Sequence, residues 1–240
     1  MQNAGLAALG LNWRYLAFEV HPNDLRAAIA GAKAYAARHK GAIQLFVRDL
    51  GQHDAVALAG TEGANTPFFS PDGKWIGYFT AASLKKVPVT GGVSMTLCEA
   101  GDNRGAVWVD PDTIIASPSF ATPLMRLSAS GGAPTPITKL NPEKNERTHR
   151  WPDVLPGGEW VVFTVGVNDS PGGYDDCDID AVSLKTGQRK TVVKGGSMAR
   201  FAASGHLLFA RKGNLLAAPI DLDSAELQGP PVAVLSGVAG

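Results

Sequence analysis

Four copies of one turn-and-strand pattern recur along this chain, with their turn positions 40, 45 and 48 residues apart. The clearest copy, TPFFSPDGKWIGYFTAASLKKVPVTGG, covers residues 66–92 and predicts three strands, at residues 66–70, 75–80 and 83–89, and a fourth strand follows at residues 93–98. In its S-P-D-G turn, proline pre-sets φ and glycine supplies the positive φ that closes the turn. A repeat of roughly 40–50 residues with four strands per copy is the signature of a β-propeller blade. The sequence therefore predicts an all-β propeller.

The repeat supplies four full blades and part of a fifth. Residues 43–50 and 55–59 indicate the two outer strands of a first blade whose inner strands are missing. We expect a partial propeller of about four to five four-stranded blades over residues 42–240. Because unpaired strand edges attract other chains, we also expect a homo-oligomer, namely a dimer. Either residues 13–20 or a second copy would complete the first blade. The full blades cover about residues 62–100, 101–140, 145–194 and 196–236.

Residues 1–41 differ from the repeats in composition and pattern, and they predict a short α/β extension. Alanine-rich helices at residues 2–10 and 22–39 flank a strand at residues 13–20. The motifs M-x-N-A, L-G-L and W-x-Y-x-A-F-E-V resemble the substrate-binding part of shikimate dehydrogenase over residues 1–34. The resemblance stops before the segment that carries that family's catalytic lysine, so it implies no dehydrogenase activity. We interpret it as a fusion fragment in a mosaic reading frame, such as a metagenomic clone contains.

The repeats themselves resemble a known family over residues 43–236. The motifs are E-G-A-N-T-P-F-F-S-P-D-G-K-W-I-G-Y-F, then L-K-K-V-P-V-x-G-G, then T-H-R-W-P-D-V-L-P-G-G. They resemble the TolB-like, or WD40-like, propeller domains, especially those attached to bacterial serine/threonine kinases. The resemblance implies binding or sensing rather than catalysis, and it implies six blades, more than this chain supplies. Related domains are often extracytoplasmic.

Charge, cysteine count and missing motifs exclude several classes of protein. Lys+Arg and Asp+Glu number 22 each, which gives no argument for a nucleic acid or a membrane surface as partner. The 2 cysteines are too few for a disulfide framework or a zinc cage. The chain as written starts without a signal peptide, so a cytoplasmic location is expected. The motifs of serine hydrolases, zincins, P-loop NTPases and dinucleotide enzymes do not occur. Whether the chain is an enzyme stays open.

A first candidate site is cationic. In a propeller blade, the residues before the first strand and those between the second and third strands lie at the channel mouth. Guanidinium groups there suit a carboxylate or a phosphate, so we expect a small anionic or ester ligand. Alternatively, the arginines hold neighbouring blades together through backbone carbonyls and Asp153. The candidate ligand-binding residues are Asn65, Arg104, Arg147, Arg150 and Arg200.

A second candidate site is acidic. The run Y-D-D-C-D-I-D places Asp175, Asp176 and Asp178 close together as ligands for a divalent metal, Ca²⁺ or Zn²⁺. With His149 and Glu146, Asp175 and Asp176 would form a catalytic group in which metal-bound water attacks an ester. The alternatives are a solvated acidic loop and a buried, structural His149.

Two functions therefore remain in view. The first is a ligand- or protein-binding module. The second is a promiscuous metal-dependent hydrolase of esters, lactones or phosphotriesters. Four tryptophans near the inner strands are expected to pack between blades rather than to stack on a ligand, namely Trp75, Trp108, Trp151 and Trp160.

Overall fold

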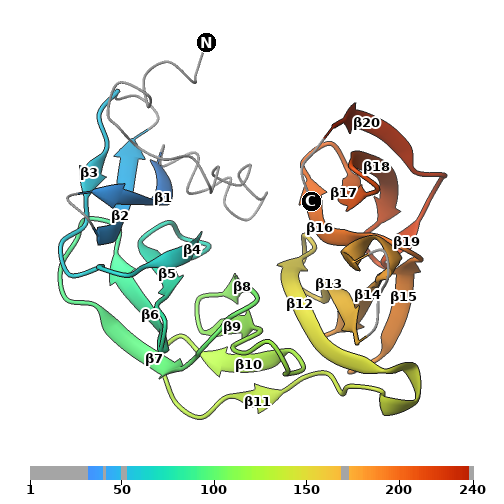
Figure 1. Cartoon of the computed structure of the whole chain (residues 1–240), viewed down its shortest axis with the longest axis horizontal. Helices are drawn as coiled ribbons and strands as arrows, with labels where there is room; N and C mark the ends of the chain where they lie inside the picture. Colours follow the sequence, from blue (N-terminus) through green and yellow to red (C-terminus); the bar gives the residue numbers. More distant parts are fainter. Residues whose placement is uncertain (1–31, 40–41, 50–52, 169–172, 238–240) are drawn as a thin grey trace. The chain divides into compact units, whose positions relative to one another are not determined.

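The computed structural model describes residues 32–39, 42–49, 53–168 and 173–237 (Figure 1). The described residues are almost entirely β, in five antiparallel sheets that follow one another along the chain. The chain divides into two compact units, residues 1–101 and residues 102–240. No helix among the described residues is long and apolar enough to cross a membrane.

The first unit contains two sheets. The second of them has the four strands that the clearest repeat predicts, in the order β4-β5-β6-β7. An apolar cluster joins the two sheets, with Leu45 and Leu58 from one and Ile76, Tyr78 and Val87 from the other. The strands are β1 (Ala32–His39), β2 (Ala42–Asp49), β3 (Val56–Ala57), β4 (Asn65–Phe69), β5 (Trp75–Phe79), β6 (Ser83–Pro88) and β7 (Met95–Glu99).

Strand β1 corrects the sequence-based expectation for residues 32–39, which were predicted as the end of a helix. These residues instead pair with β2 along their whole length, from Ala32 opposite Asp49 to His39 opposite Ala42. The ring of Tyr35 stacks on Phe46, with centroids 5.7 Å apart. Cross-strand pairing thus outweighs the helix propensity of alanine. The first sheet therefore has three strands among the described residues, and residues 32–39 supply a strand that was expected from residues 13–20 or from a second copy. Residues 1–31 lie outside the described part of the chain.

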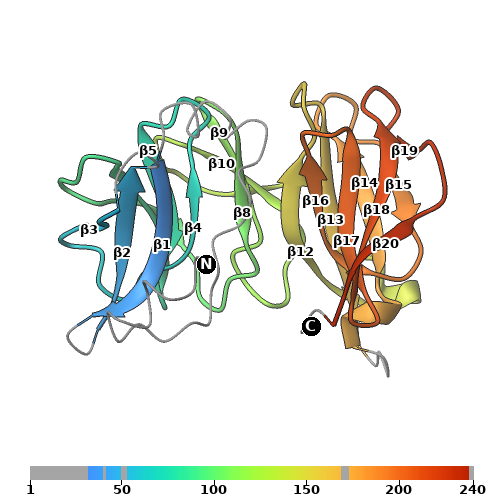
Figure 2. The same ribbon diagram turned by 90° about the horizontal axis from the view of Figure 1, so that it is seen from above.

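The second unit contains three sheets, which match the three later repeats. Their orders are β8-β9-β10-β11, β12-β13-β14-β15, and β16-β17-β18 followed by β19 and β20, both of which pair with β18. Figure 2 shows β17 beside β18 in the last of these sheets. The strands are β8 (Ala106–Asp110), β9 (Thr113–Ala116), β10 (Met125–Ser128), β11 (Thr135–Pro136), β12 (Glu146–Val154), β13 (Trp160–Val167), β14 (Asp178–Ser183), β15 (Arg189–Val193), β16 (Ser197–Ala202), β17 (His206–Arg211), β18 (Asn214–Asp221), β19 (Glu226–Leu227) and β20 (Val232–Ser236). Two short 3-10 helices, η1 (Pro142–Lys144) and η2 (Gly173–Asp176), flank the middle sheet.

Apolar side chains fill the space between neighbouring sheets of this unit. Val109 and Ile115 of one sheet pack against Val161 and Phe163 of the middle sheet. On the other side of the middle sheet, a second cluster includes Trp160, Ile179, Phe201 and Phe209. The middle sheet is therefore covered on both faces, as strands with almost continuous apolar runs require.

The predicted S-P-D-G turn forms between β4 and β5. The Ser70 hydroxyl donates to the Asp72 carboxylate at 2.6 Å, and the Gly73 amide donates to the Ser70 carbonyl at 2.9 Å. Gly73 has φ +69°, a conformation that glycine adopts without strain. The turn prediction is confirmed in its mechanism.

A β-bulge in the first strand recurs in three sheets. At each bulge a non-glycine residue has positive φ: Thr66 (48°), Trp151 (50°) and Met198 (57°). Such values are rare for branched or bulky residues. At Trp151 the bulge turns the backbone toward β8, and the Trp151 amide donates to the Arg104 carbonyl at 2.7 Å. The bulge therefore fixes Arg104, Arg150 and Trp151 next to one another.

Candidate functional site

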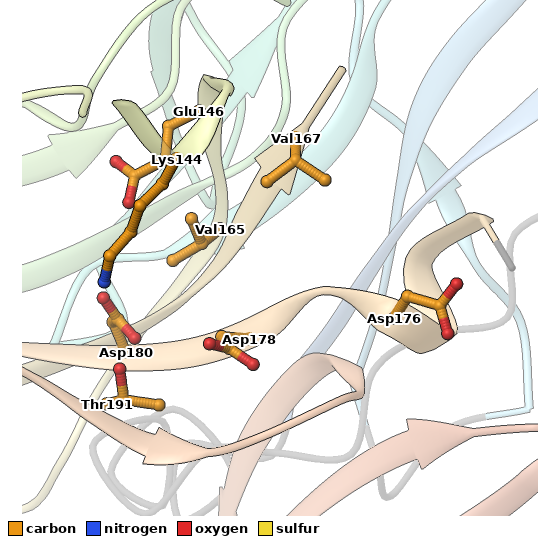
Figure 3. Close-up of a pocket in the computed structure, with 8 residues that line it drawn as sticks. All are labelled: Lys144, Glu146, Val165, Val167, Asp176, Asp178, Asp180 and Thr191. Carbon is orange, nitrogen blue, oxygen red and sulfur yellow. The ribbon is translucent and has the colours of Figure 1, made fainter. Parts of the chain in front are cut away.

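Two pockets open at one end of the middle sheet, where β12 begins, β13 ends and β14 begins. One, of about 150 Å³, is the acidic pocket; its lining residues are Lys144, Glu146, Val165, Val167, Asp176, Asp178, Asp180 and Thr191 (Figure 3). The other, of about 210 Å³, is the basic pocket; its lining residues are Arg147, Thr148, Arg150, Gly166, Val167, Asn168, Gly173, Tyr174 and Cys177. Because side chains alternate along β13, Val165 faces one pocket and Gly166 the other.

A buried ion-pair network forms the floor of the acidic pocket. Arg189 on β15 donates through Nη2 to Glu146 at 2.7 Å and through Nε to Asp180 at 2.7 Å. Its Nη1 also donates to Glu146, at 3.0 Å. The paired, fork-like geometry is the strong form of an arginine–carboxylate contact.

His149 completes this network from inside the sheet. Its side chain has no exposed surface; Nδ1 lies 2.7 Å from the Thr138 hydroxyl and Nε2 lies 3.2 Å from Glu146 Oε2. Burial and the nearby Arg189 charge lower the pKa of His149 to about 4, despite the opposing effect of Glu146. A neutral imidazole can donate to Glu146 through Nε2 and accept from Thr138 through Nδ1.

The carboxylate of Glu146 stays ionised in this setting. Burial alone would raise its pKa, but hydrogen bonds from Arg189 and from the Asn141 amide outweigh burial and hold the pKa below its usual value. Burial likewise opposes the charge of Arg189, but its bonds to Glu146 and Asp180 prevail and raise its pKa. Glu146 thus forms hydrogen bonds with both His149 and Arg189, and these three side chains hold one another in place. The structure places His149 where the alternative interpretation had it, as a buried histidine.

The three candidate metal ligands on η2 and β14 have other contacts. Asp175 accepts from the Lys212 amide at 2.6 Å, and Asp178 accepts from the Gly195 amide at 3.2 Å. Asp176 lines the acidic pocket but stands apart from Asp180 in Figure 3. Across the described residues, no three His, Cys, Asp or Glu side chains are grouped so that they could hold a metal ion. Through its bond to the Lys212 amide, Asp175 stabilises the turn between β17 and β18.

Arg150 is the centre of the basic pocket. Arg150 is 4% exposed, and its Nη1 donates to the Tyr174 hydroxyl. The guanidinium lies over the ring of Tyr174, 4.9 Å from its centroid, and 5.7 Å from that of Trp151. Its Nε is buried and has no hydrogen-bond partner. Among the described residues, no carboxylate lies at ion-pair distance from Arg150.

The charge of Arg150 is therefore poorly compensated. Burial, together with the neighbouring charges of Arg104 and Arg147, lowers its pKa to about 10. At neutral pH the group is still protonated, because about 10 lies well above 7. The side chain is thus a buried cation held by aromatic rings rather than by an acid.

Two other atoms shape this pocket. The Thr148 hydroxyl is buried and has no hydrogen-bond partner. Gly166, directly opposite Thr148 in the β12–β13 ladder, leaves room for both side chains. A Cβ at Gly166 would come within 2.6 Å of Thr148 Cγ2 and 3.4 Å of Arg150 Nε. The glycine therefore makes space for the unpartnered Arg150 Nε and Thr148 hydroxyl.

The other predicted arginines surround Arg150 in different roles. Arg147 is exposed and lies over the Phe120 ring, while Arg104 pairs with Asp102 at 2.9 Å. Arg200 donates to the carbonyls of Trp151 and Ala199, which is the structural role that the alternative interpretation gave to these arginines. Asn65 belongs to the first unit, where it accepts from Thr66 at 3.2 Å.

Several important residues were missed by reasoning from the sequence. Asp180 had a usable signal, because Asp178 and Asp180 alternate along a strand and so share one face. Arg189 had none, since it reaches Glu146 across two intervening strands. Tyr174, Thr148 and Gly166 join Arg150 only through the strand register and the η2 turn.

No protein-family model matches this sequence. A shikimate dehydrogenase (NADP(+)) from Methanothermobacter thermautotrophicus is 34% identical over 113 residues, which cover 42% of this chain and 38% of the enzyme. This match confirms a partial resemblance, and its extent exceeds the residues 1–34 on which the motifs were recognised. It covers less than half of either chain and carries no dehydrogenase activity over to this one.

Solved structures define the class of fold, which is a β-propeller in partial form. The TolB of Acinetobacter baumannii matches with a TM-score of 0.64 at 13% identity, over 88% of this chain and 53% of that one. Regucalcin, a calcium-binding protein from Agrobacterium tumefaciens, matches at 0.58 and 11% over 73% of this chain and 60% of that one. An oligogalacturonate lyase in complex with manganese matches at 0.51 and 10% over 91% and 76%. The fold is thus TolB-like, and the chain spans about half the length of that TolB.

Proposed function

We propose that this chain is a ligand-binding module, and that its basic pocket takes a small anion, a carboxylate or a phosphate, at Arg150. The observation that carries the proposal is the buried Arg150 guanidinium, whose Nε has no hydrogen-bond partner. A bound anion would supply the missing acceptor.

The energetic argument rests on the cost of burying a charge. A buried cation without a paired anion is unfavourable, and a bound anion that pairs with it would remove this cost. Aromatic rings offset part of this cost through cation–π contacts of about 0.5–2 kcal/mol each. They leave the planar fork of donors available, and that fork matches carboxylate or phosphate oxygens.

The surroundings support an anion rather than a neutral ligand. Arg147 lines the same pocket and is exposed, so it can approach a bound anion from the solvent side. Thr148 contributes a hydroxyl that can donate to an anion's oxygen. The pocket, at about 210 Å³, is small compared with typical drug-sized sites of roughly 300–1,000 Å³, which favours a compact ligand.

The metal-dependent hydrolase is supported less well. The names of two structural neighbours mention calcium or manganese, but those metals belong to those proteins. In this chain, the contacts of His149, Glu146, Asp175 and Asp178 are with other parts of the protein. A buried His149 is also poorly placed to take a proton from water.

Isothermal titration calorimetry at pH 7 with inorganic phosphate and with succinate tests the proposal. We expect one saturable site in the wild type, and at least about tenfold weaker binding in Arg150→Gln, since a hydrogen bond to a charged group contributes about 1.5–3 kcal/mol. Arg126→Gln, at an exposed arginine on β10, is the matched control and should bind as the wild type does.

Arg150→Lys separates charge from geometry, because lysine keeps the charge but loses the planar fork. We expect intermediate affinity. Circular dichroism and thermal melting establish that each variant is folded. Equal affinity in wild type and Arg150→Gln, or no saturable binding of either anion to the folded wild type, would overturn the proposal.

A further inference from the structure

The buried network under the acidic pocket carries one negative charge too many. It contains two carboxylates, Glu146 and Asp180, and one guanidinium, Arg189, because His149 is neutral above its lowered pKa. Both acids are at least nine-tenths buried, with Glu146 8% and Asp180 5% exposed. A buried charge without a counter-charge is unfavourable, so this arrangement calls for a cation.

Asp180 shows where that cation would bind. One of its oxygens, Oδ2, accepts from Arg189 Nε at 2.7 Å. The other, Oδ1, is buried and has no hydrogen-bond partner. Asp180 lines the acidic pocket, whose volume of about 150 Å³ exceeds the roughly 30 Å³ of one water molecule. The pocket therefore has both space and an unused acceptor.

The rest of the lining fits an organic cation. Asp178 and Thr191 lie beside Asp180 on strands β14 and β15, so their oxygens add acceptors to the same wall (Figure 3). Val165 and Val167, on the neighbouring strand β13, add apolar surface to the pocket beside these oxygens, against which an alkyl group can pack. Metal coordination is not favoured, since no three acidic side chains in the described part of the chain converge on one point.

We propose that the acidic pocket binds one primary alkylammonium group, anchored by Asp180 and assisted by Asp178 and Thr191. An ammonium group carries the single positive charge that the network lacks, and its three N–H donors match these oxygen acceptors. This binding site is separate from the basic pocket and takes a ligand group of the opposite charge.

Lys144 acts as a tethered competitor for the same pocket. It is exposed, lies at the end of η1 and extends its own ammonium group over the pocket (Figure 3). It makes no ion pair with Asp180 among the pairs that the described residues form. Removing the lysine side chain therefore frees the pocket for an external ammonium group.

The test uses ethylammonium chloride as the probe and follows backbone amide shifts by ¹H–¹⁵N NMR at constant ionic strength. Saturable shifts are expected at Asp178, Asp180 and Thr191. Tetramethylammonium, which has the charge but no N–H donor, should produce much smaller shifts. Binding to Asp180→Asn should be at least about tenfold weaker. The matched control Asp112→Asn, at an exposed acid between β8 and β9, should bind as the wild type does.

Two further variants keep the proposal falsifiable. Lys144→Ala should bind ethylammonium several-fold more tightly than the wild type, and Thr191→Val should bind it more weakly even if Asp180→Asn does not fold. Arg150→Gln should leave ammonium binding unchanged, so failure of the anion proposal and failure of this one are distinguishable. Calcium chloride that shifts the same amides while ethylammonium does not would overturn the ammonium assignment. Equal ethylammonium affinity in wild type, Asp180→Asn and Thr191→Val, or no saturable shift in wild type and Lys144→Ala, would overturn it as well.

Discussion

A histidine without exposed surface has to find its hydrogen-bond partners inside the protein, and His149 does so in its neutral form. Thr138 and Glu146 occupy its two ring nitrogens. In the unfolded chain its pKa returns to about 6.5, whereas in the folded protein it is about 4. The unfolded state therefore binds the extra proton first as the pH falls.

This difference predicts how stability depends on pH. The contribution of His149 is fully present above pH 6.5 and is lost as the pH falls toward about 4, by at most ~3 kcal/mol. The lowered pKa of Glu146 acts in the same direction at the acidic end of this range. Urea unfolding at several pH values between 4.5 and 7.5 measures the effect.

His149→Gln is the informative variant, because glutamine can hydrogen-bond to Thr138 and Glu146 but does not titrate. Its free energy of unfolding should fall less steeply between pH 6.5 and 4.5 than that of the wild type. Parallel curves for the two proteins would show that His149 is not the titrating group.

The tryptophans differ in burial, and this sets what each contributes. Trp108 and Trp160 are both buried, at 3% and 6% exposed, and Trp160 packs between two sheets as predicted. Trp160 also donates to the Asp223 carbonyl at 2.9 Å. Trp151 is only half-buried and has its ring against Tyr174, so it belongs to the surroundings of Arg150.

Truncating these two rings should have unequal effects. We expect Trp160→Ala to lower the free energy of unfolding by about 3–5 kcal/mol, as for other buried aromatic residues. Trp151→Ala should cost clearly less, because Trp151 is more exposed than Trp160. Chemical denaturation compares them directly. A larger loss at Trp151 than at Trp160 would contradict the burial pattern.

At the scale of the element, one aromatic ring packs directly over a glycine on the neighbouring strand. Gly77 on β5 lies opposite Phe68 on β4, and the phenyl ring covers the glycine. A Cβ at Gly77 would come within 2.3 Å of Phe68 Cζ. The ring fills the place that a side chain would otherwise take.

Gly77→Ala should therefore destabilise the protein by about 1–3 kcal/mol, the usual cost of overpacking. Gly101→Ala is the matched control, since its Cβ would meet only the Ala81 carbonyl, at 3.6 Å. The control should stay within about 0.5 kcal/mol of the wild type. Thermal melting followed by circular dichroism measures both, and similar melting temperatures for the two variants would refute the prediction.

The elements show why some of the fold was predictable and some was not. The hairpins were predictable because Pro71, Gly73 and their counterparts fix backbone angles locally. Strand β1 was not, because its alanines favour a helix in isolation and only pairing with β2 selects a strand. The bulges at Thr66, Trp151 and Met198 had no local signal, since these residue types rarely adopt positive φ.

The candidate site divides in the same way. Arg150 and Asp178 could be placed near one end of the sheet from the repeat alone. Which arginine would be buried could not be predicted, since it depends on the bulge at Trp151 and the space at Gly166. The long-range pairing of Glu146 with Arg189 could not be predicted from the sequence either.

At the scale of the whole molecule, β1 covers the edge of β2 and so protects the first sheet from pairing with other chains. Deleting residues 1–40 removes β1 and exposes the edge of β2, so we expect aggregated or insoluble protein. Deleting residues 1–31 retains β1 and should preserve solubility. Among the described residues the first sheet has three strands, and we propose that a second copy completes it in a homodimer, of about twice 25.1 kDa.

Size-exclusion chromatography with light scattering checks both statements. Equal solubility and melting temperature for the two deletions would mean that β1 is dispensable. A mass of one chain at every concentration tested would reject the dimer.

The central claim is that the partial propeller binds an anion at Arg150, and an anomalous-scattering experiment tests it over the whole molecule at once. Crystals soaked in selenate carry a tetrahedral dianion that the anomalous map locates without prior assumption. Our account predicts a peak in the basic pocket, within hydrogen-bond distance of Arg150 Nε and the Thr148 hydroxyl, which is absent from crystals of Arg150→Gln. Selenate found only at exposed lysines and arginines, with none beside Arg150, would contradict the account.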